Sequence, residues 1–280
     1  MKASFQSDPQ PIDSRVHSLA IHSPNDSHDD STISTTNSYA ALTPTIIRNA
    51  SIDLQNWSPI NTFRLDVGDY NAKYDDIQDV QRVAPDDLAS QMTLIDLSIF
   101  VAIQPQELSS GQWNGTRKYQ NSPNVVAFTQ RFNRVSFWVI QEILSHKTAK
   151  HRAEVAGHFL KVAKRLLDLN NLHSAFAIKS ALSSAPIHRL SKTWELLSRK
   201  DKQTFKLLDD LFADTDNFER LRDHLSSTKT PCIPYLGLYL HDIVYVDVAH
   251  PMSRGRPTQH WKNKMDSILR IIAEFQRSVY

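Results

Sequence analysis

Hydrophobic and polar positions divide the chain into two parts. From Met1 to about Tyr70 the sequence is dominated by Ser, Thr, Asp, Asn and Pro. Its scattered apolar residues follow neither the period of a helix nor that of a strand. Such a segment cannot bury enough apolar surface to offset the conformational entropy lost on ordering. We therefore expect a disordered tail over residues 1–73, either a plain solvated extension or a phosphorylated regulatory arm.

Helical periodicity begins at about Tyr74. Ser122 is a natural N-cap, and Pro123 stands at the first helical position. Asp216 and Glu219 have the spacing of a capping box at the start of another helix. After Pro123, apolar residues recur three and four positions apart, at Phe128, Phe132, Val135, Val139 and Ile143. Similar apolar stripes predict helices over 152–169, 172–182, 200–212 and 260–280.

Strand patterns are nearly absent from this second part. The one ambiguous stretch is IVYVDV at 243–248, which suits either a strand or a helix. We therefore predict an all-α fold, with a single domain over residues 74–280 that is larger than a four-helix bundle.

A long apolar run, TPCIPYLGLYLHDIVYVDVAHP, occupies residues 230–251. Asp242 and Asp247 interrupt it, so it falls short of the ~20 apolar residues that a membrane-spanning helix needs. The N-terminus lacks the apolar stretch of a secretory signal, and a lone cysteine, Cys232, excludes an intrachain disulfide. These features predict a cytoplasmic protein that reaches membranes at most by peripheral recruitment.

Residues that carry common chemistry are missing or wrongly spaced. None of the six glycines has the spacing of a dinucleotide-binding fingerprint, and there is no Gly-Lys-Ser/Thr phosphate loop. Among the twelve histidines, the nearest cluster, His146 and His151, has the wrong spacing for a helical metal pair. Cys232 suits a small buried hydrophobic residue better than a nucleophile. We therefore expect no cofactor, no metal site and no covalent catalysis.

Charge gives little indication of a partner. The chain has 32 basic and 30 acidic residues, so its net charge of +2 favours neither nucleic acid nor an anionic membrane. Basic residues cluster at 146–152 and 199–206, but acidic residues such as Asp201 interrupt the second cluster. Solvated helix faces explain these clusters better than a nucleic-acid stripe does, and nucleic-acid binding is the weakest functional alternative.

Four stretches, taken in order, resemble the catalytic domain of guanine-nucleotide exchange factors for Ras-like GTPases, the Cdc25-homology family. They are QMTLIDLSIFVAIQPQEL (91–108), SPNVVAFTQRFNRVSFWV (122–139), LDLNNLHSAFAIKSALSSAPIHRLSKTW (167–194) and TPCIPYLGLYLHDIVYVD (230–247). The resemblance covers about residues 74–280. It is strongest to the Ral-directed branch, among members that carry a pleckstrin-homology domain after the catalytic domain.

This resemblance implies an all-helical bowl with a protruding helical hairpin that opens the nucleotide site of the GTPase. The run at 230–247 would start in the core and continue into the first arm of the hairpin, and 260–275 would form the returning arm. The family pattern places Val244, Asp247 and Val248 on the face that pries the site open. The alternative, in which the whole run is a buried helix, stays open.

The resemblance also implies partner contacts and scaffold positions. Asn133 and Arg134, in RFNRVSFW, lie off the apolar stripe and would face the switch regions of the GTPase, although plain exposed positions are an alternative. Val101 and Phe218 match further contact positions, and the periodicity of Phe218 also suits the core. Scaffold roles fall on Asn170 and Asn171, through capping and interhelix hydrogen bonds, and on Pro186 and Arg189, through a fixed loop.

Two positions depart from the family pattern. Some members carry a carboxylate where Val248 stands, and many carry a basic residue where Val101 stands. Steric displacement of the magnesium ion is therefore expected, in place of displacement by a carboxylate. Two functions fit the sequence: exchange on a Ral-like GTPase, which requires no covalent chemistry, or a non-catalytic scaffold that binds a GTPase or another helix-rich partner.

Overall fold

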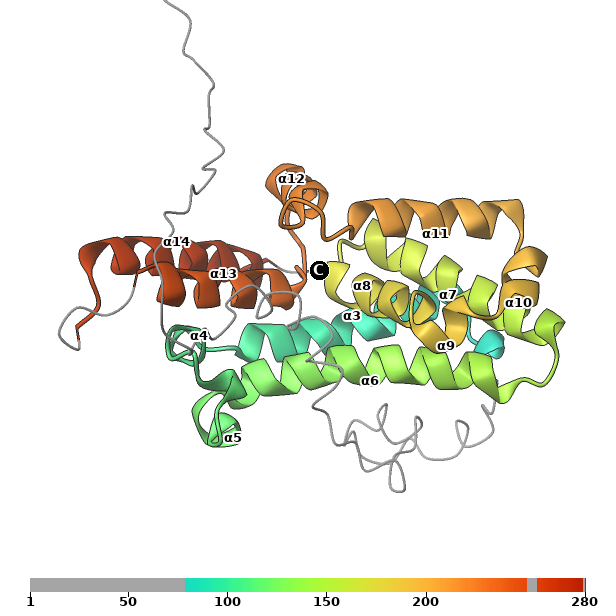
Figure 1. Ribbon diagram of the computed structural model, residues 1–280, viewed down its shortest axis with the longest axis horizontal. Helices are drawn as coiled ribbons and strands as arrows, with labels where there is room; N and C mark the ends of the chain where they lie inside the picture. Colours follow the sequence, from blue (N-terminus) through green and yellow to red (C-terminus); the bar gives the residue numbers. More distant parts are fainter. Residues whose placement is uncertain (1–78, 251–255, 279) are drawn as a thin grey trace, which may run out of the picture. The chain divides into compact units, whose positions relative to one another are not determined.

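The computed structural model describes residues 79–250, 256–278 and 280, and the tail predicted at 1–73 lies outside them. Within the described residues every named element is a helix (Figure 1), which confirms the all-α prediction. The α-helices are α3 (Pro85–Ala102), α4 (Pro105–Ser109), α5 (Lys118–Asn121), α6 (Pro123–Ser145), α7 (Ala149–Asp168), α8 (Leu172–Leu182), α9 (Ala185–His188), α10 (Ser191–Leu196), α11 (Arg199–Leu211), α12 (Glu219–Ser227), α13 (Leu236–Ala249) and α14 (Gln259–Gln276). Two short 3-10 helices are η2 (Val80–Arg82) and η3 (Gln112–Asn114).

Helix α8 lies at the centre of the packing. Nine of its eleven residues are buried, because its sequence is apolar or small on nearly every face. It packs against α6, α7 and α3 (Figure 1). Phe128 on α6 and Phe159 on α7 are fully buried in this core. The stripes that were visible in the sequence therefore form one continuous core around α8.

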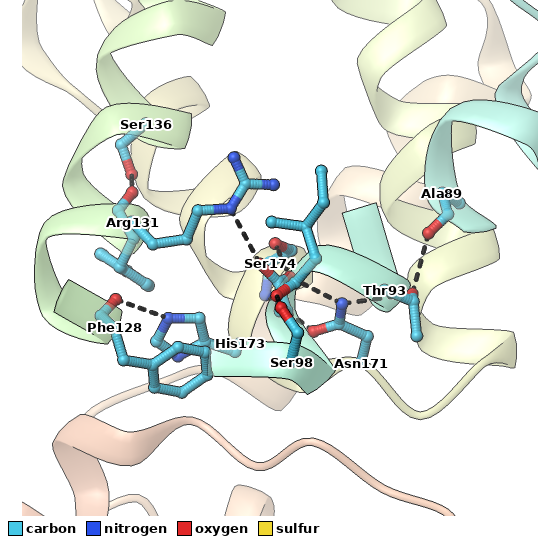
Figure 2. Close-up of polar contacts among 12 residues, drawn as sticks. Ala89, Thr93, Ser98, Phe128, Arg131, Ser136, Asn171, His173 and Ser174 are labelled. Carbon is cyan, nitrogen blue, oxygen red and sulfur yellow. Dashed lines mark hydrogen bonds and ion pairs between the residues drawn. The ribbon is translucent and has the colours of Figure 1, made fainter. Parts of the chain in front are cut away.

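A buried polar network joins three of these helices (Figure 2). Asp96 on α3 is fully buried, and its carboxylate accepts hydrogen bonds from Arg131 Nε on α6 at 3.0 Å and from Asn171 Nδ2 at 2.8 Å. Ser174 Oγ on α8 also donates to this carboxylate. Asn171 Nδ2 lies 3.2 Å from Thr93 Oγ1 as well. These bonds replace the lost hydration of the carboxylate and fix α3, α6 and α8 relative to one another.

A buried histidine lies beside this network. His173 stacks on Phe128 with ring centroids 3.7 Å apart, and its Nε2 lies 3.3 Å from the carbonyl oxygen of Phe128. Burial lowers the pKa of His173 to about 4, so the ring is neutral at pH 7 and donates to that oxygen. His173 therefore serves as a hydrogen-bonded member of the aromatic core.

The N-terminus of α6 is capped by a residue from another helix. Ser122 stands at the N-cap position, as predicted, but its side chain accepts no capping bond and donates to the carbonyl oxygen of Glu107 at 3.2 Å. The Glu107 carboxylate, on α4, accepts instead from the backbone nitrogens of Asn124 at 2.8 Å and Val125 at 3.1 Å. A negative charge at a helix N-terminus is favourable, and here it is also buried.

We expect the Glu107→Gln substitution to lower the free energy of unfolding by about 1–3 kcal/mol, because it replaces a charge-assisted cap with a weaker neutral one. Urea unfolding of the two proteins measures this difference. Glu154→Gln, at an exposed position on α7, is the matched control and should change the free energy by less than about 0.5 kcal/mol. Equal effects at the two positions would contradict the capping role of Glu107.

The stretch 243–248, which suited either a strand or a helix in the sequence, is helical as part of α13 and buries Ile243 and Val246 on one side. One local expectation was wrong. The capping box at Asp216 and Glu219 does not form. Asp216, Asn217 and Phe218 instead have φ angles of 51°, 56° and 60°, and α12 begins at Glu219 without a side-chain cap.

Candidate functional site

Helices α13 and α14 form a hairpin (Figure 1). The first half of α13 is buried on nearly every side, whereas Tyr245 and Val248 in its second half are 58% and 61% exposed. Val244 lies one turn before Val248 and is half-buried against the core. The apolar run therefore begins in the core and ends as an exposed arm, and it leaves large apolar side chains in solvent near the tip.

Asp247 is tied to the second arm of the hairpin. Its Oδ1 accepts a hydrogen bond of 2.7 Å from Nε1 of Trp261 on α14. A β-carbon at Gly111 would lie 3.4 Å from Oδ2 of Asp247, so the loop before η3 passes beside the same carboxylate. Gly111 has a φ of 64°, a conformation that glycine adopts without strain. Asp247 thus has a structural contact inside the hairpin, whereas Val248 presents its side chain to solvent.

The base of the hairpin meets the end of α3. Nε2 of Gln276, at the end of α14, donates to the carbonyl oxygens of Phe100 at 2.8 Å and Ile103 at 2.9 Å. Val101, between these two residues, is 47% exposed. Val248 lies 12 residues beyond Leu236, or about 18 Å along α13. Val101 and Val248 therefore belong to opposite ends of the hairpin.

Phe218 packs at the start of α13. Its ring centroid lies 6.2 Å from that of Phe176 and 6.4 Å from that of Tyr235, and the side chain is half-buried. A left-handed backbone is strained for a bulky residue, and here it holds Phe218 at the edge of this aromatic cluster. Phe132 on α6 also contacts Tyr235, with centroids 5.4 Å apart. The cluster brings Phe218 close to the part of α6 that carries the RFNRVSFW motif.

The two motif residues on α6 lie in different environments. Arg134 is exposed, whereas Asn133 is only 8% exposed. Asn133 follows Phe132 directly, and that ring packs into the aromatic cluster. The side chain of Arg134 is therefore accessible from solvent, whereas that of Asn133 is largely covered by the domain itself.

The Asn170–Asn171 pair connects α8 to the segment before α13. Oδ1 of Asn171 accepts from the backbone nitrogen of Ser174 at 3.1 Å, so Asn171 caps α8 and also reaches Asp96 on α3. Asn170, in a left-handed conformation, donates from Nδ2 to the carbonyl oxygen of Pro231 at 3.1 Å. Its own carbonyl oxygen accepts from the backbone nitrogen of Ile233 at 3.0 Å. The pair therefore holds the segment before α13 against the core.

Pro186 and Arg189 lie in the turn between α8 and α10. Pro186 occupies the first turn of α9, where its missing N–H costs no hydrogen bond. The backbone nitrogen of Arg189, the C-cap residue of α9, donates to Ala185 at 3.3 Å. Both side chains are exposed. They therefore shape a turn at the surface.

An ion pair between α12 and α13 was not predicted from the sequence. Nη1 and Nη2 of Arg222 donate to Oδ2 and Oδ1 of Asp242 at 2.8 and 2.7 Å. Nε of Arg222 donates to the carbonyl oxygen of Asn217 at 2.8 Å. One guanidinium therefore links the left-handed turn before α12 to the first arm of the hairpin. The only signal in the sequence was the interruption of the apolar run at Asp242, which did not identify the partner.

We expect a double-mutant cycle of Arg222→Ala and Asp242→Ala to give a coupling free energy on the order of 1–2 kcal/mol, because the pair is bidentate and partly buried. Urea unfolding of the single and double variants measures it. The matched control is the pair of Arg220 and Asp210, whose side chains are 62% and 54% exposed. The control coupling should be at most about 0.5 kcal/mol, and a larger value than that of the Arg222 pair would contradict this interpretation.

The described residues lack the groups expected of a site for covalent or metal chemistry. Cys232 is buried, and burial raises its pKa to about 12, so its sulfur is a thiol at pH 7 and a poor nucleophile. No three side chains of His, Cys, Asp or Glu in this part of the chain are grouped so as to hold a metal ion. The candidate site consists of the exposed apolar arm of α13, the aromatic cluster at its start and the exposed Arg134 on α6. Exposed apolar side chains of this kind are typical of surfaces that contact another macromolecule.

Comparison with known proteins identifies the family of this chain. The family model described as the RasGEF domain matches residues 87–265, and the chain therefore belongs to the RasGEF family. The match spans α3 to the middle of α14, so it includes both arms of the hairpin.

Individual relatives agree with this assignment. The human Ras-specific guanine nucleotide-releasing factor RalGPS2 is 54% identical over 202 residues, which are 71% of this chain and 35% of the relative. Mouse RalGPS1 is 54% identical over 214 residues, 75% of this chain and 37% of the relative. Ras guanine nucleotide exchange factor M of Dictyostelium discoideum is 31% identical over 203 residues, 70% of this chain and 22% of the relative. The chain spans about a third of the length of the RalGPS relatives that it matches.

Proposed function

We propose that this protein promotes the release of GDP from a Ras-like GTPase, with Ral as the expected partner. Membership of the RasGEF family is the observation that carries the proposal. The names of RalGPS1 and RalGPS2 support the choice of partner, because both relatives are 54% identical to this chain. In this proposal the GTPase is contacted at the base of the hairpin by four residues: Val101, Arg134, Asn133 and Phe218.

The exposed arm of α13 supplies the displacing surface. Val248 would enter the region beside the nucleotide and crowd the magnesium ion, and Val244 would support it from one turn earlier. Asp247 is less suited to repel the ion, because its carboxylate already accepts a hydrogen bond from Trp261. The proposed displacement is therefore steric.

Exchange by this route requires that the factor bind the nucleotide-free GTPase more tightly than the nucleotide-bound one. It requires no nucleophile. A GTPase can hold its nucleotide with a dissociation constant on the order of picomolar, or about −16 kcal/mol, so unaided release is slow. If the factor lowers the affinity of the GTPase for nucleotide, then bound nucleotide lowers the affinity of the GTPase for the factor to the same extent. The excess of GTP in the cell then sets the direction of exchange.

A non-catalytic scaffold is the second candidate. Val248 and Val101 favour it, because some family members carry a carboxylate at the first position and many carry a basic residue at the second. Such a scaffold would keep the hairpin and bind a GTPase without loosening its nucleotide.

The affinity of the chain for nucleotide-free and GDP-loaded Ral separates the two candidates. Exchange requires much tighter binding to the nucleotide-free form, by linkage. Equal affinity for both forms would exclude exchange and leave the scaffold function. Binding to neither form would remove Ral as the partner.

The same proposal sets the expected location. No helix among the described residues has the length and apolar character needed to cross a bilayer. We propose that the protein works in the cytoplasm and is brought to the plasma membrane through its GTPase.

A further inference from the structure

Two basic segments that are separate in the sequence come together in the fold. They are residues 146–154, at the junction of α6 and α7, and residues 189–202, which include α10 and the start of α11. Nε of Arg152 on α7 donates to Thr193 Oγ1 on α10 at 3.2 Å. A β-carbon at Gly157 on α7 would lie 3.0 Å from Oδ2 of Asp201 on α11. The first half of α7 therefore gathers the two segments at one end of the helical array, away from α13 and α14 (Figure 1).

This end of the domain, which we call the basic end, is strongly charged. The two segments carry eight basic and three acidic residues, so their net charge of +5 exceeds the +2 of the whole chain. Seven of the eight basic residues have exposed side chains. Besides Arg189, the C-cap residue of α9, these are the six cations that we follow here: Lys147, Lys150, Lys192, Arg199, Lys200 and Lys202. Sequence spacing alone suggested solvated helix faces, because it did not show that these cations share one end of the fold.

The six cations lack acidic partners within the described residues. Every ion pair found there uses another basic residue: Arg131, Lys164, Arg165, Lys179, Arg220 or Arg222. Asp201, which might have paired with them, instead accepts from Ser198 Oγ at 2.7 Å and faces Gly157. The positive charge of the basic end is therefore available to an anionic partner.

Exposed leucines lie among these cations. Leu196, at the end of α10 between Lys192 and Arg199, is 57% exposed, and Leu144, near the end of α6, is 45% exposed. Cations with interspersed apolar side chains suit the interface of an anionic bilayer, where charge meets the headgroups and leucine enters the acyl boundary. Nucleic acid would use the cations and would gain little from the leucines.

We infer that the basic end is a docking surface for anionic membranes, which binds the lipid headgroups and leaves the hairpin free at the other end of the domain. Five of the six cations are lysines, which act as point charges on a headgroup layer and need no fixed bidentate geometry. Binding through such a surface is peripheral and weakens with salt, because exposed charges are screened over about 8 Å at physiological ionic strength.

Vesicle sedimentation tests this inference without a GTPase, so its result is independent of the proposed exchange function. The full chain should sediment with phosphatidylcholine vesicles that contain phosphatidylserine and not with pure phosphatidylcholine vesicles. The triple variant Lys147→Glu, Lys192→Glu, Lys200→Glu should bind at least tenfold more weakly. The matched control Lys262→Glu, Lys264→Glu, Arg270→Glu makes the same charge change at exposed positions of α14 and should stay within about twofold of the unmodified chain.

A second variant distinguishes binding to lipid from binding to other anionic partners. Leu196→Ser leaves the charge unchanged, and we expect it to weaken vesicle binding about threefold or more while thermal unfolding shows an intact fold. The inference is overturned if the phosphatidylserine vesicles are not bound, or if the α14 control loses as much binding as the triple variant. Binding to a double-stranded oligonucleotide that exceeds binding to the vesicles would overturn it as well.

Discussion

Replacing Asp96 by alanine should lower the free energy of unfolding by about 3–5 kcal/mol. Asp96 is fully buried and accepts bonds from Arg131, Asn171 and Ser174, which come from α6, the N-cap of α8 and α8 itself. The substitution leaves the guanidinium of Arg131 buried without this carboxylate, and it removes a shared acceptor at the meeting point of three helices. No other single polar residue described above links as many core helices.

Urea unfolding at neutral pH measures this change. Asp87→Ala, at an exposed position of the same helix, is the matched control and should alter the free energy of unfolding by less than about 0.5 kcal/mol. A loss below about 1 kcal/mol for Asp96→Ala would show that the network contributes little to the stability of the core.

Substituting Val248 by arginine should slow GDP release by at least about tenfold, or about 1.4 kcal/mol in the barrier. The side chain is 61% exposed, so the larger residue fits without disturbing the core. A partner that packs against α13 would have to accept a long, hydrated cation where a small apolar side chain had been. The thermal midpoint should stay unchanged while the exchange rate falls.

The control for this variant is Leu196→Arg, measured with soluble GTPase and without vesicles. Leu196 is 57% exposed on α10, so it offers the same chemical change at a similar exposure but far from the hairpin. It should leave the release rate within about twofold of the unmodified chain. Equal slowing by both variants, or normal exchange with Val248→Arg, would show that α13 does not form the displacing surface.

Helices of this fold were largely predictable because their apolar stripes repeat locally. The stretch 172–182 coincides with α8, and the stretch 260–280 overlaps α14 closely. The cap of α6 was not predictable from a local pattern. Glu107 caps α6 across 17 positions of sequence, and no local pattern announces a contact of that separation.

The candidate site was predictable only in part. Family motifs identified the hairpin and the exposed Val248, but they did not show that Trp261 engages Asp247 or that Asn133 is buried. The spacing of Asp216 and Glu219 predicts a capping box, whereas the structure has a left-handed turn that ends at Phe218. Each of these features depends on side chains from distant helices, and a single sequence does not reveal which helices meet.

The most direct test of the account is release of a fluorescent GDP analogue from purified Ral, Rap, Ras and Rho-type GTPases, with and without the full chain. The account predicts acceleration with Ral that rises with the concentration of the chain and is absent with the Rho-type protein. Acceleration of Rap or Ras alone would keep the mechanism and correct the partner. Unchanged release from every GTPase in the set would contradict the exchange function.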